Sequence, residues 1–216
     1  MPSSPSPASD AWAVVVAAGL GTRFGGPKQF EPLRDRRVID WSLAAARGAC
    51  AGVVCVLPPG HAGTEDAADL CVPGGVTRSA SVRAGLAAVP DDAEVIVVHD
   101  AARPVAPVSL FAAVIAAVRA GADAAVPGVA VHDTIRHRAE GVVDRTHLVA
   151  VQTPQAFRAA ALRAAHAAGG EATDDAALVE AAGGTVVVVP GASHNLKITD
   201  PGDLRIAAVL LDEAEQ

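Results

Sequence analysis

Residues 14–29 read VVVAAGLGTRFGGPKQ, a valine-rich run that breaks into a glycine-rich turn with two cations. A short, uninterrupted apolar run is typical of a strand that is buried on both faces of a parallel sheet. Gly19 and Gly21 allow a tight turn in which backbone N–H groups approach an anion. The guanidinium of Arg23 and the ammonium of Lys28 both suit phosphate oxygens. The stretch therefore predicts a polyphosphate site at the carboxyl end of a first strand.

The spacing of the glycines separates this turn from two common phosphate-binding loops. A Walker loop needs Gly-Lys-Ser/Thr after four intervening residues, and this sequence is absent. A dinucleotide fingerprint needs a third glycine where Phe24 stands. It also needs an acid about 20 residues further on. Asp40 is close to that spacing but lies inside a predicted helix. A dinucleotide-dependent oxidoreductase therefore remains only as an alternative from another class.

Composition limits the class of protein. The chain has 216 residues, of which 51% are hydrophobic and 3% aromatic, and its net charge is −7. This length suits one sizeable domain, which we expect over residues 11–216, after a loose tail at residues 1–10. The negative charge argues against general nucleic-acid binding. No run approaches the length of a membrane span, and no secretory signal is recognised. Three cysteines without a Cys-x-x-Cys favour buried thiols in a reducing compartment, so we expect a cytoplasmic protein.

Strands and helices alternate along the chain, which is typical of an α/β fold. Strands are expected at residues 14–18, 51–57, 70–73, 94–98, 123–127 and 185–189. Helices are expected at residues 38–49, 64–70, 77–89 and 107–120, then up to about residue 168, at 175–182, and from Pro201 to near the end. Asp200 is the expected N-cap of that last helix. The predicted architecture is a Rossmann-like three-layer sandwich with a mostly parallel central sheet.

The strand at residues 94–98 leads into His99-Asp100-Ala101-Ala102-Arg103-Pro104. Residues just beyond a parallel strand face the ligand crevice. There, Asp100 can bind a metal ion or a ribose, and Arg103 a phosphate, although an Asp–Arg pair can also simply close a turn. His99 is best interpreted as a structural histidine. Gly74-Gly75 precedes another predicted helix, whose N-terminus presents free N–H groups to a ligand.

Residues 131–136 and 141–145 alternate apolar with polar positions, which predicts a hairpin. We call residues 131–150 the arm. A lone hairpin is marginally stable in water, so the arm should pack on the body of the protein or on a second subunit. Thr134 and Arg145 are possible phosphate binders, or polar residues of a solvated hairpin. Lys197 is the only lysine after Lys28, and its apolar neighbours in a strand-like segment make it a candidate site residue.

Taken together, these segments resemble the family of 2-C-methyl-D-erythritol 4-phosphate cytidylyltransferases of the non-mevalonate isoprenoid pathway. The matching pieces are the Ala-Ala-Gly-x-Gly-x-Arg turn through Gln29, Gly74-Gly75 with Arg78 and Ser81-Val82, residues 99–104, Asp133-Thr134, Asp144-Arg145, residues 153–155, Thr173-Asp174 and residues 195–199. They follow the family's order and span nearly the whole chain beyond the tail. Pro27-Lys28-Gln29 resembles the cytidylyl branch of the nucleotidyltransferases in particular.

The resemblance implies a homodimer with interlocked arms, CTP and a polyol phosphate as substrates, and Mg²⁺ as cofactor, held at Asp100. The implied catalytic residues are Arg23, Lys28, Arg145 and Lys197. The implied CTP-binding residues are Ala17, Ala18, Gly19, Gly21, Gly75, Ser81, Asp100 and Ala101. The implied acceptor-binding residues are Asp100, Arg103, Thr134, Arg145, Thr153 and Thr173, with Thr134 and Arg145 reaching the partner subunit's site.

Two positions depart from the family's pattern. The loop between Arg23 and Lys28 is about two residues shorter than in many members, and Val76 stands where some members carry an acid. Residue chemistry separates 2-C-methyl-D-erythritol 4-phosphate poorly from another acceptor such as ribitol 5-phosphate. A non-catalytic nucleotide-binding regulator is a further alternative, which the three separate cations and Asp100 argue against.

Overall fold

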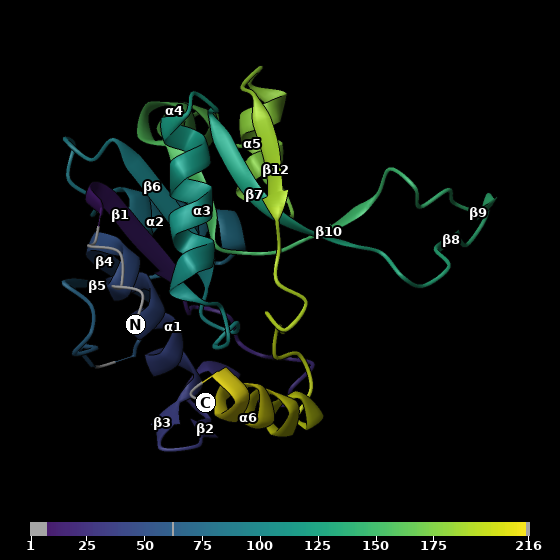
Figure 1. Ribbon diagram of the computed structural model, residues 1–216. Coiled ribbons are helices and arrows are strands. Elements are labelled where there is room, and N and C mark those ends of the chain that lie inside the picture. Colours follow the sequence, from purple (N-terminus) through teal and green to yellow (C-terminus); the bar gives the residue numbers. More distant parts are fainter. Residues whose placement is uncertain (1–7, 62, 215–216) are drawn as a thin grey trace.

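A single mixed sheet forms the centre of the molecule (Figure 1). The structure is a computed structural model that describes residues 8–61 and 63–214. Its helices are α1 (Val38–Ala49), α2 (Arg78–Leu86), α3 (Val108–Arg119), α4 (Ala159–Ala167), α5 (Asp175–Ala181), α6 (Gly202–Ala214) and the short 3₁₀ helix η1 (Lys28–Phe30). Its strands are β1 (Ala8–Val16), β2 (Pro32–Leu33), β3 (Arg36–Arg37), β4 (Cys50–Leu57), β5 (Leu70–Pro73), β6 (Val95–Asp100), β7 (Ala124–Ala130), β8 (Arg136–His137), β9 (Gly141–Val142), β10 (Val149–Val151), β11 (Gln155–Arg158) and β12 (Val186–Pro190).

The main sheet has eight strands in the order β10-β7-β11-β6-β1-β4-β5, with β12 paired to β7. The pairs β6–β1, β1–β4, β4–β5 and β12–β7 are parallel, whereas β11 and β10 run antiparallel to their neighbours. The expected mostly parallel sheet is therefore confirmed. Because β1 and β6 are adjacent and parallel, the turn after β1 and the loop after Asp100 meet at one edge of the sheet.

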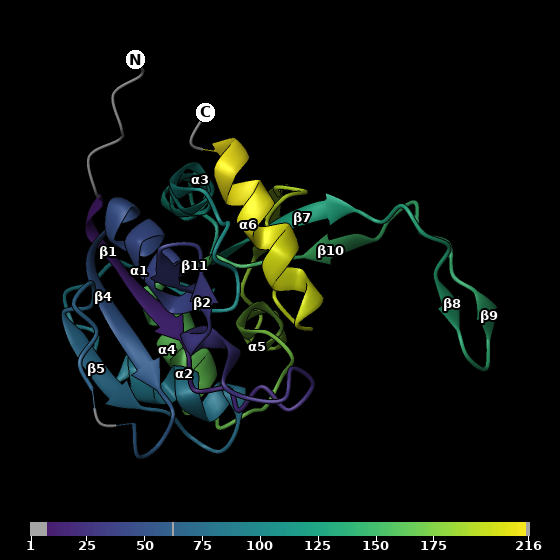
Figure 2. The same ribbon diagram turned by 90° about the horizontal axis from the view of Figure 1, so that it is seen from below.

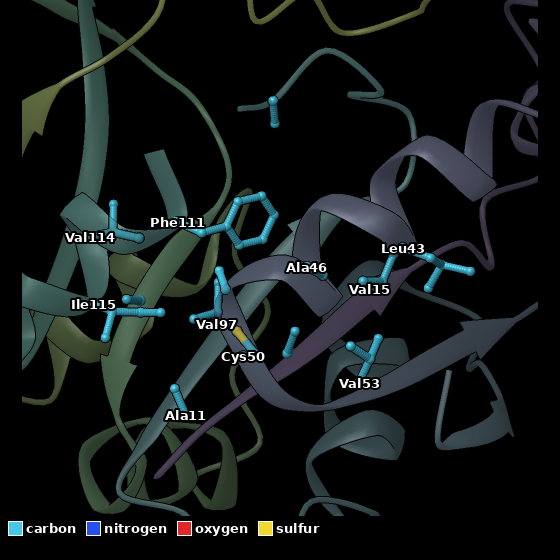
Figure 3. Close-up of a cluster of buried hydrophobic side chains, with 14 of the residues drawn as sticks. Ala11, Val15, Leu43, Ala46, Cys50, Val53, Val97, Phe111, Val114 and Ile115 are labelled. Carbon is cyan, nitrogen blue, oxygen red and sulfur yellow. The ribbon is translucent and has the colours of Figure 1, made fainter. Parts of the chain in front are cut away.

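Helices cover both faces of the sheet, which gives the three predicted layers. Alternate residues of β1 supply the two sides: Val15 packs with α1 and α3, while Val14 packs with α2, α4 and α5. Figure 3 shows part of the first cluster, with Leu43 of α1 and Phe111 of α3 on the same side of the strands. This two-sided burial explains the uninterrupted valine run in the sequence.

A third apolar cluster holds α6, which lies below the sheet in Figure 1 and covers neither of its faces. The expected stripe of α6 is confirmed, because Ala207 and Leu211 are buried against Leu33, Val38 and Ile198. The helix begins at Gly202, one residue later than expected, and the Asp203 carboxylate accepts the backbone N–H groups of residues 199 and 200.

The arm projects away from the body of the molecule (Figures 1 and 2). Its ladder is shorter than predicted, because only β8 and β9 pair within it. Its root is β10, whose residues from Val149 pair with β7. The apolar side chain of Val142 is 65% exposed at the β9 strand. No residue of the arm is buried by the part of the chain that the structure describes, so the arm lacks the packing that stabilises a hairpin.

Three other local predictions need correction. The helix expected at residues 64–70 is a loop, because the Glu65 carboxylate pairs with Arg37 and the Asp69 carboxylate binds the Val53 N–H. The strands β10 and β11 were not predicted, because each is short and Pro154 lies between them. The expected tail lies largely outside the described residues, but β1 begins at Ala8 and so includes three residues assigned to the tail.

Within the described ranges, residues 8–61 and 63–214, no helix combines the length and apolar character that a membrane crossing requires.

Candidate active site

A cleft of about 710 Å³ opens at the carboxyl ends of β1 and β6. Three segments line most of it: the turn after β1, the stretch from Gly74 into α2, and the loop that begins at Asp100. Lys197 reaches the same cleft from the segment before α6. The cleft thus brings together Arg23, Lys28, Lys197, Ala17, Ala18, Gly19, Gly21, Gly75, Ser81, Asp100 and Ala101, all of which the sequence predicted as site residues.

The turn after β1 is held by its own backbone and by one buried amide. The Gly21 carbonyl accepts the N–H groups of residues 24, 25 and 26 at 2.9, 2.9 and 3.2 Å. Gly21 has φ +63°, and a Cβ there would lie 1.8 Å from the carbonyl oxygen of Gly26. The Gln29 side chain donates to the carbonyl oxygens of Ala17 and Gly19 at 2.7 and 3.1 Å. Glycine at position 21 is therefore a steric requirement, and Gln29 is a site-supporting residue to which the sequence analysis gave no role.

Cations from distant parts of the chain influence one another in the cleft. Burial lowers the pKa of the Lys28 ammonium, and repulsion from Lys197 and Arg23 lowers it further. Lys28 and Lys197 lie far apart in the sequence, so the repulsion between them shows that the fold brings their side chains close together. A cluster of like charges of this kind is stabilised by a polyanion such as a triphosphate.

Asp100 is the acid at the centre of these cations. The Lys197 ammonium lies 2.5 Å from Asp100 Oδ2, and Arg78 Nε lies 3.6 Å from Asp100 Oδ1. Burial alone would raise the pKa of Asp100, but Lys197 and Arg78 outweigh it and hold the pKa well below its usual value. Asp100 is therefore an ionised carboxylate throughout the neutral range, as a metal ligand must be.

The donor set at Asp100 fits Mg²⁺ and a triphosphate together. No group of three or more His, Cys, Asp or Glu side chains suitable for a metal occurs among the described residues. Mg²⁺ is commonly held by one or two carboxylates, substrate phosphates and water, rather than by a cage of protein ligands. A single ionised carboxylate that lines a cation-rich cleft meets this requirement.

The start of α2 forms the other wall of the cleft. Thr77 is the N-cap of α2, and its hydroxyl accepts the Ala80 N–H at 3.0 Å. The Gly75 N–H donates to the Ser81 hydroxyl at 3.1 Å, and that hydroxyl donates to the Thr77 carbonyl at 2.9 Å. A Cβ on Gly74 would lie 2.4 Å from the Cβ of Ala18. The wall is thus closely packed and rigid, which suits recognition of a planar base.

His99 is a structural residue, as the sequence analysis expected. It is fully buried, and burial lowers its pKa to about 4. Its Nε2 lies 3.3 Å from the Arg103 carbonyl oxygen, and its Nδ1 lies 3.3 Å from the Thr153 hydroxyl. A neutral imidazole with Nε2–H donating satisfies both contacts. His99 therefore braces the loop that carries Asp100 and Arg103.

The predicted acceptor-binding residues lie outside the lining of the cleft in one chain, apart from Asp100. Thr153 is buried, and its hydroxyl accepts the Asp100 N–H at 3.0 Å. Arg103 donates from Nη1 to the Asn195 carbonyl at 2.8 Å, while its buried Nε has no partner in the described part of the chain. Thr173 is exposed just before α5. Acceptor binding by these residues stays a prediction.

Thr134 and Arg145 both lie on the arm, exposed and away from the cleft of their own chain. The Arg145 guanidinium donates to the carbonyl of His132 within the arm. Their predicted role needs a second subunit and stays a prediction.

Arg78 is the charged cleft residue to which the sequence analysis assigned no role. It lies in the first turn of α2 and contacts two carboxylates, Asp100 and Asp175. In the sequence, Arg78 was noted only as part of the segment from Gly74 to Val82 that resembles the family. Asp40, which a dinucleotide fold would need at a ribose, instead pairs with Arg37 at 2.6 Å. The requirements of the oxidoreductase alternative are therefore not met.

A mostly parallel sheet with a glycine-rich turn, converging cations and one ionised acid at its carboxyl edge resembles the nucleotidyltransferase class. The comparisons with known proteins narrow this class. The family model of 2-C-methyl-D-erythritol 4-phosphate cytidylyltransferase matches residues 11–213, so the chain belongs to this family.

Relatives and solved structures agree with this assignment. A 2-C-methyl-D-erythritol 4-phosphate cytidylyltransferase of Nocardia farcinica is 45% identical over 93% of this chain and 93% of its own length. The crystal structure of the Thermus thermophilus protein of that name has a TM-score of 0.80 at 40% identity and covers 92% of this chain and 98% of its own. A "Bifunctional enzyme IspD/IspF" of Dinoroseobacter shibae is 46% identical over 94% of this chain. The chain spans 54% of that bifunctional relative, about half its length.

Proposed function

We propose that this chain transfers CMP from CTP to 2-C-methyl-D-erythritol 4-phosphate, giving 4-diphosphocytidyl-2-C-methyl-D-erythritol and pyrophosphate. The observation that carries the proposal is the convergence of Lys28, Lys197 and Asp100 in one cleft beside a glycine-rich turn. Membership of the family supplies the identity of the two substrates.

In the proposed reaction, an oxygen of the acceptor phosphate attacks the α-phosphorus of CTP in line with the leaving group. A bond forms between that oxygen and the α-phosphorus, and the bond from the α-phosphorus to the bridging oxygen of the β-phosphate breaks. Pyrophosphate leaves with the electron pair. A phosphate monoester is already anionic at neutral pH, so the step needs no general base. The protein's task is to align two anions and stabilise the developing charge.

The cations of the cleft carry out this task in the proposal. Arg23 and Lys28 bind the β- and γ-phosphates above the turn after β1, and Lys197 binds the α-phosphate. The Lys197 ammonium, which contacts the Asp100 carboxylate at 2.5 Å, would turn toward the α-phosphate in this proposal. Asp100 would hold Mg²⁺, which when bound supplies further positive charge to the phosphate oxygens. The loss of one such cation typically costs on the order of 10²–10³ in kcat.

The proposed nucleoside site is the wall formed by Gly75 and Ser81, with Ala17, Ala18 and Ala101 on the adjoining strand ends. These residues all line the cleft. The Ser81 side chain is almost fully buried, with its hydroxyl held by the backbone of Gly75 and Thr77. A fixed hydroxyl and fixed amides can distinguish cytosine from other bases by their hydrogen bonds, which mobile groups cannot do as well.

We propose that the acceptor site is completed by a second copy of the chain through the arm. Support comes from exposed apolar side chains along the arm and the strands at its root: Ile135, Val142, Leu148, Val149, Val151, Val187 and Val188. Apolar surface of this extent on a projecting hairpin favours an interface between subunits. In such a dimer, Thr134 and Arg145 would reach the partner subunit and bind the acceptor phosphate there, together with Arg103, Thr153 and Thr173 at the margin of the cleft.

We also propose that the reaction takes place in the cytoplasm. The three cysteines are all free thiols in the structure, which agrees with a reducing compartment.

The test is pyrophosphate release by the purified chain with CTP, Mg²⁺ and 2-C-methyl-D-erythritol 4-phosphate. Ribitol 5-phosphate is the competing acceptor, and ATP, GTP and UTP are the competing nucleotides. The proposal predicts release only with CTP and the methylerythritol phosphate. Release with ribitol 5-phosphate instead would reassign the acceptor, and no release with any pair would refute nucleotidyl transfer.

A further inference from the structure

A row of charged and hydrogen-bonded side chains runs from the cleft into the interior on the α2–α4–α5 side of the sheet. Its members are His166 of α4, Asp175 of α5, Arg78 of α2 and Asp100. His166 Nε2 lies 2.9 Å from Asp175 Oδ1, and Arg78 Nη1 lies 2.8 Å from Asp175 Oδ2. Arg78 Nε then lies 3.6 Å from Asp100 Oδ1. The three helices lie on the same face of the sheet (Figure 2).

Asp175 cannot contact a substrate. Its side chain has no exposed surface, and it is not part of the cleft lining. Each of its oxygens has one partner, His166 or Arg78. A carboxylate buried in this way is strongly unfavourable unless it is paired, so its position ties α4, α5 and the first turn of α2 together.

Arg78 is the link between this buried acid and the cleft. Its guanidinium is a rigid planar fork, so fixing one nitrogen also fixes the direction of the others. With Nη1 on Asp175, Nε lies 3.6 Å from Asp100 Oδ1, at ion-pair distance. Burial lowers the pKa of Arg78, but Asp175 and Asp100 outweigh it and raise the pKa above its usual value. Arg78 therefore stays a permanent cation between two acids.

We propose that Asp175 is a positioning residue for nucleotidyl transfer: by fixing Arg78, it sets the place of the Asp100 carboxylate in the cleft. This inference rests on the proposed function. With Oδ1 at ion-pair distance from Arg78 and Oδ2 paired with Lys197, the Asp100 carboxylate keeps one place in the cleft, where it would hold Mg²⁺. His166 completes the arrangement by occupying the other oxygen of Asp175, so that the carboxylate keeps one orientation.

The test variant is Asp175→Asn. Asparagine has nearly the same shape, and its amide can accept from Arg78 and donate to His166, but it has no charge to hold the guanidinium. We expect kcat to fall about 10- to 100-fold, the loss typical of a small misplacement of reacting groups. The dissociation constant of CTP with Mg²⁺, measured by calorimetry, should rise less than about threefold, because every group that touches CTP is still present.

The matched control is Glu65→Gln. Glu65 is also a buried carboxylate paired with an arginine, at 2.6 Å from Arg37, but it lies outside the cleft lining. Both variants replace a buried acid by its amide, so both should lower the melting temperature. Only Asp175→Asn should lower kcat. Equal activity of the two variants would refute the positioning role.

A double mutant separates action through Arg78 from a general structural effect. If Asp175 acts only through Arg78, Arg78→Gln and Arg78→Gln/Asp175→Asn should have the same kcat. Additive losses would refute this mechanism. Arg78→Lys is a second variant, to be used if Asp175→Asn does not fold, because it leaves Asp175 with a cation. The lysine ammonium is a single point of charge and lacks the planar fork that reaches Asp175 and Asp100 at once, so the kcat of this variant should also fall about 10- to 100-fold, and full activity would overturn the inference.

The wild-type assay distinguishes a failure of the proposed function from a failure of the positioning role. If the wild-type chain releases no pyrophosphate, the proposed function itself fails. If the wild type is active and Asp175→Asn matches it within about twofold, only the positioning role fails.

Discussion

Replacing Lys197 by methionine tests the catalytic role of one cation while keeping a side chain of similar length. Its ammonium pairs with Asp100 Oδ2 at 2.5 Å, but the lysine side chain is 40% exposed. Loss of a pair between exposed groups costs about 0–1 kcal/mol, and the Asp100 side chain, which is only 13% exposed, adds a desolvation cost that Arg78 offsets in part. Each kcal/mol lowers the melting temperature of a chain of this size by about 2–4 °C. The folded protein should therefore survive the substitution, and Asp100 keeps Arg78 as a partner.

The effect on the reaction should be far larger than the effect on stability. If Lys197 stabilises charge on the α-phosphate, its loss removes about 2.7–4 kcal/mol of transition-state stabilisation, or 10²–10³ in kcat. The assay is the initial rate of pyrophosphate release at saturating CTP and acceptor, with a thermal melt of the same preparation. Arg47→Met is the matched control, because Arg47 is also 40% exposed and pairs with Asp69 at 2.8 Å, outside the cleft. A kcat of Lys197→Met within about fivefold of the control would refute the assignment.

Three further outcomes follow from the same structure. Gly21→Ala should reduce kcat/KM at least about 100-fold, because the new Cβ would lie 1.8 Å from the Gly26 carbonyl oxygen and displace the turn; unchanged kinetics would show that the turn is not a phosphate site. The Arg145→Ala and Lys28→Ala homodimers should each be nearly inactive. When the two variants are mixed and exchange subunits, activity should return, because each heterodimer then holds one site with both residues intact. Confirmed heterodimers without activity would place the whole site in one chain. The pKa of His99 is about 4 in the folded protein and 6.5 in the unfolded chain, so the unfolded chain binds more protons between these values. The free energy of unfolding should therefore fall by about 3 kcal/mol as the pH falls from 6.5 to 4. Urea unfolding of the wild type and His99→Gln measures this difference, and parallel curves would contradict it.

The parts of the fold that sequence could predict are those with local causes. The valine run of β1 predicted a strand buried on both faces, and the helix expected at residues 38–49 has those bounds as α1. The helix expected at residues 64–70 failed because the partners of Glu65 and Asp69 lie far away in the sequence. Side chains committed to such tertiary contacts override a weak local preference for helix.

The candidate site also has a part that the sequence could predict and a part that it could not. The turn after β1 and the acid at Asp100 follow strands, so their meeting at one edge of the sheet could be predicted from the order of the elements. The pairing of Arg78 with Asp175 could not, because the two residues are 97 positions apart and neither belongs to a local motif for an ion pair. Only the packing of α4 and α5 beside α2 brings them together.

The most direct test of the account is a crystal structure of the chain with CTP and Mg²⁺. The account predicts that the Lys197 ammonium leaves Asp100 and lies within about 3 Å of an α-phosphate oxygen, a hydrogen-bond distance. It also predicts Arg23 and Lys28 on the outer phosphates, above residues 19–26. A triphosphate bound away from this turn, with Lys197 still on Asp100, would contradict the claim that these cations converge on one triphosphate.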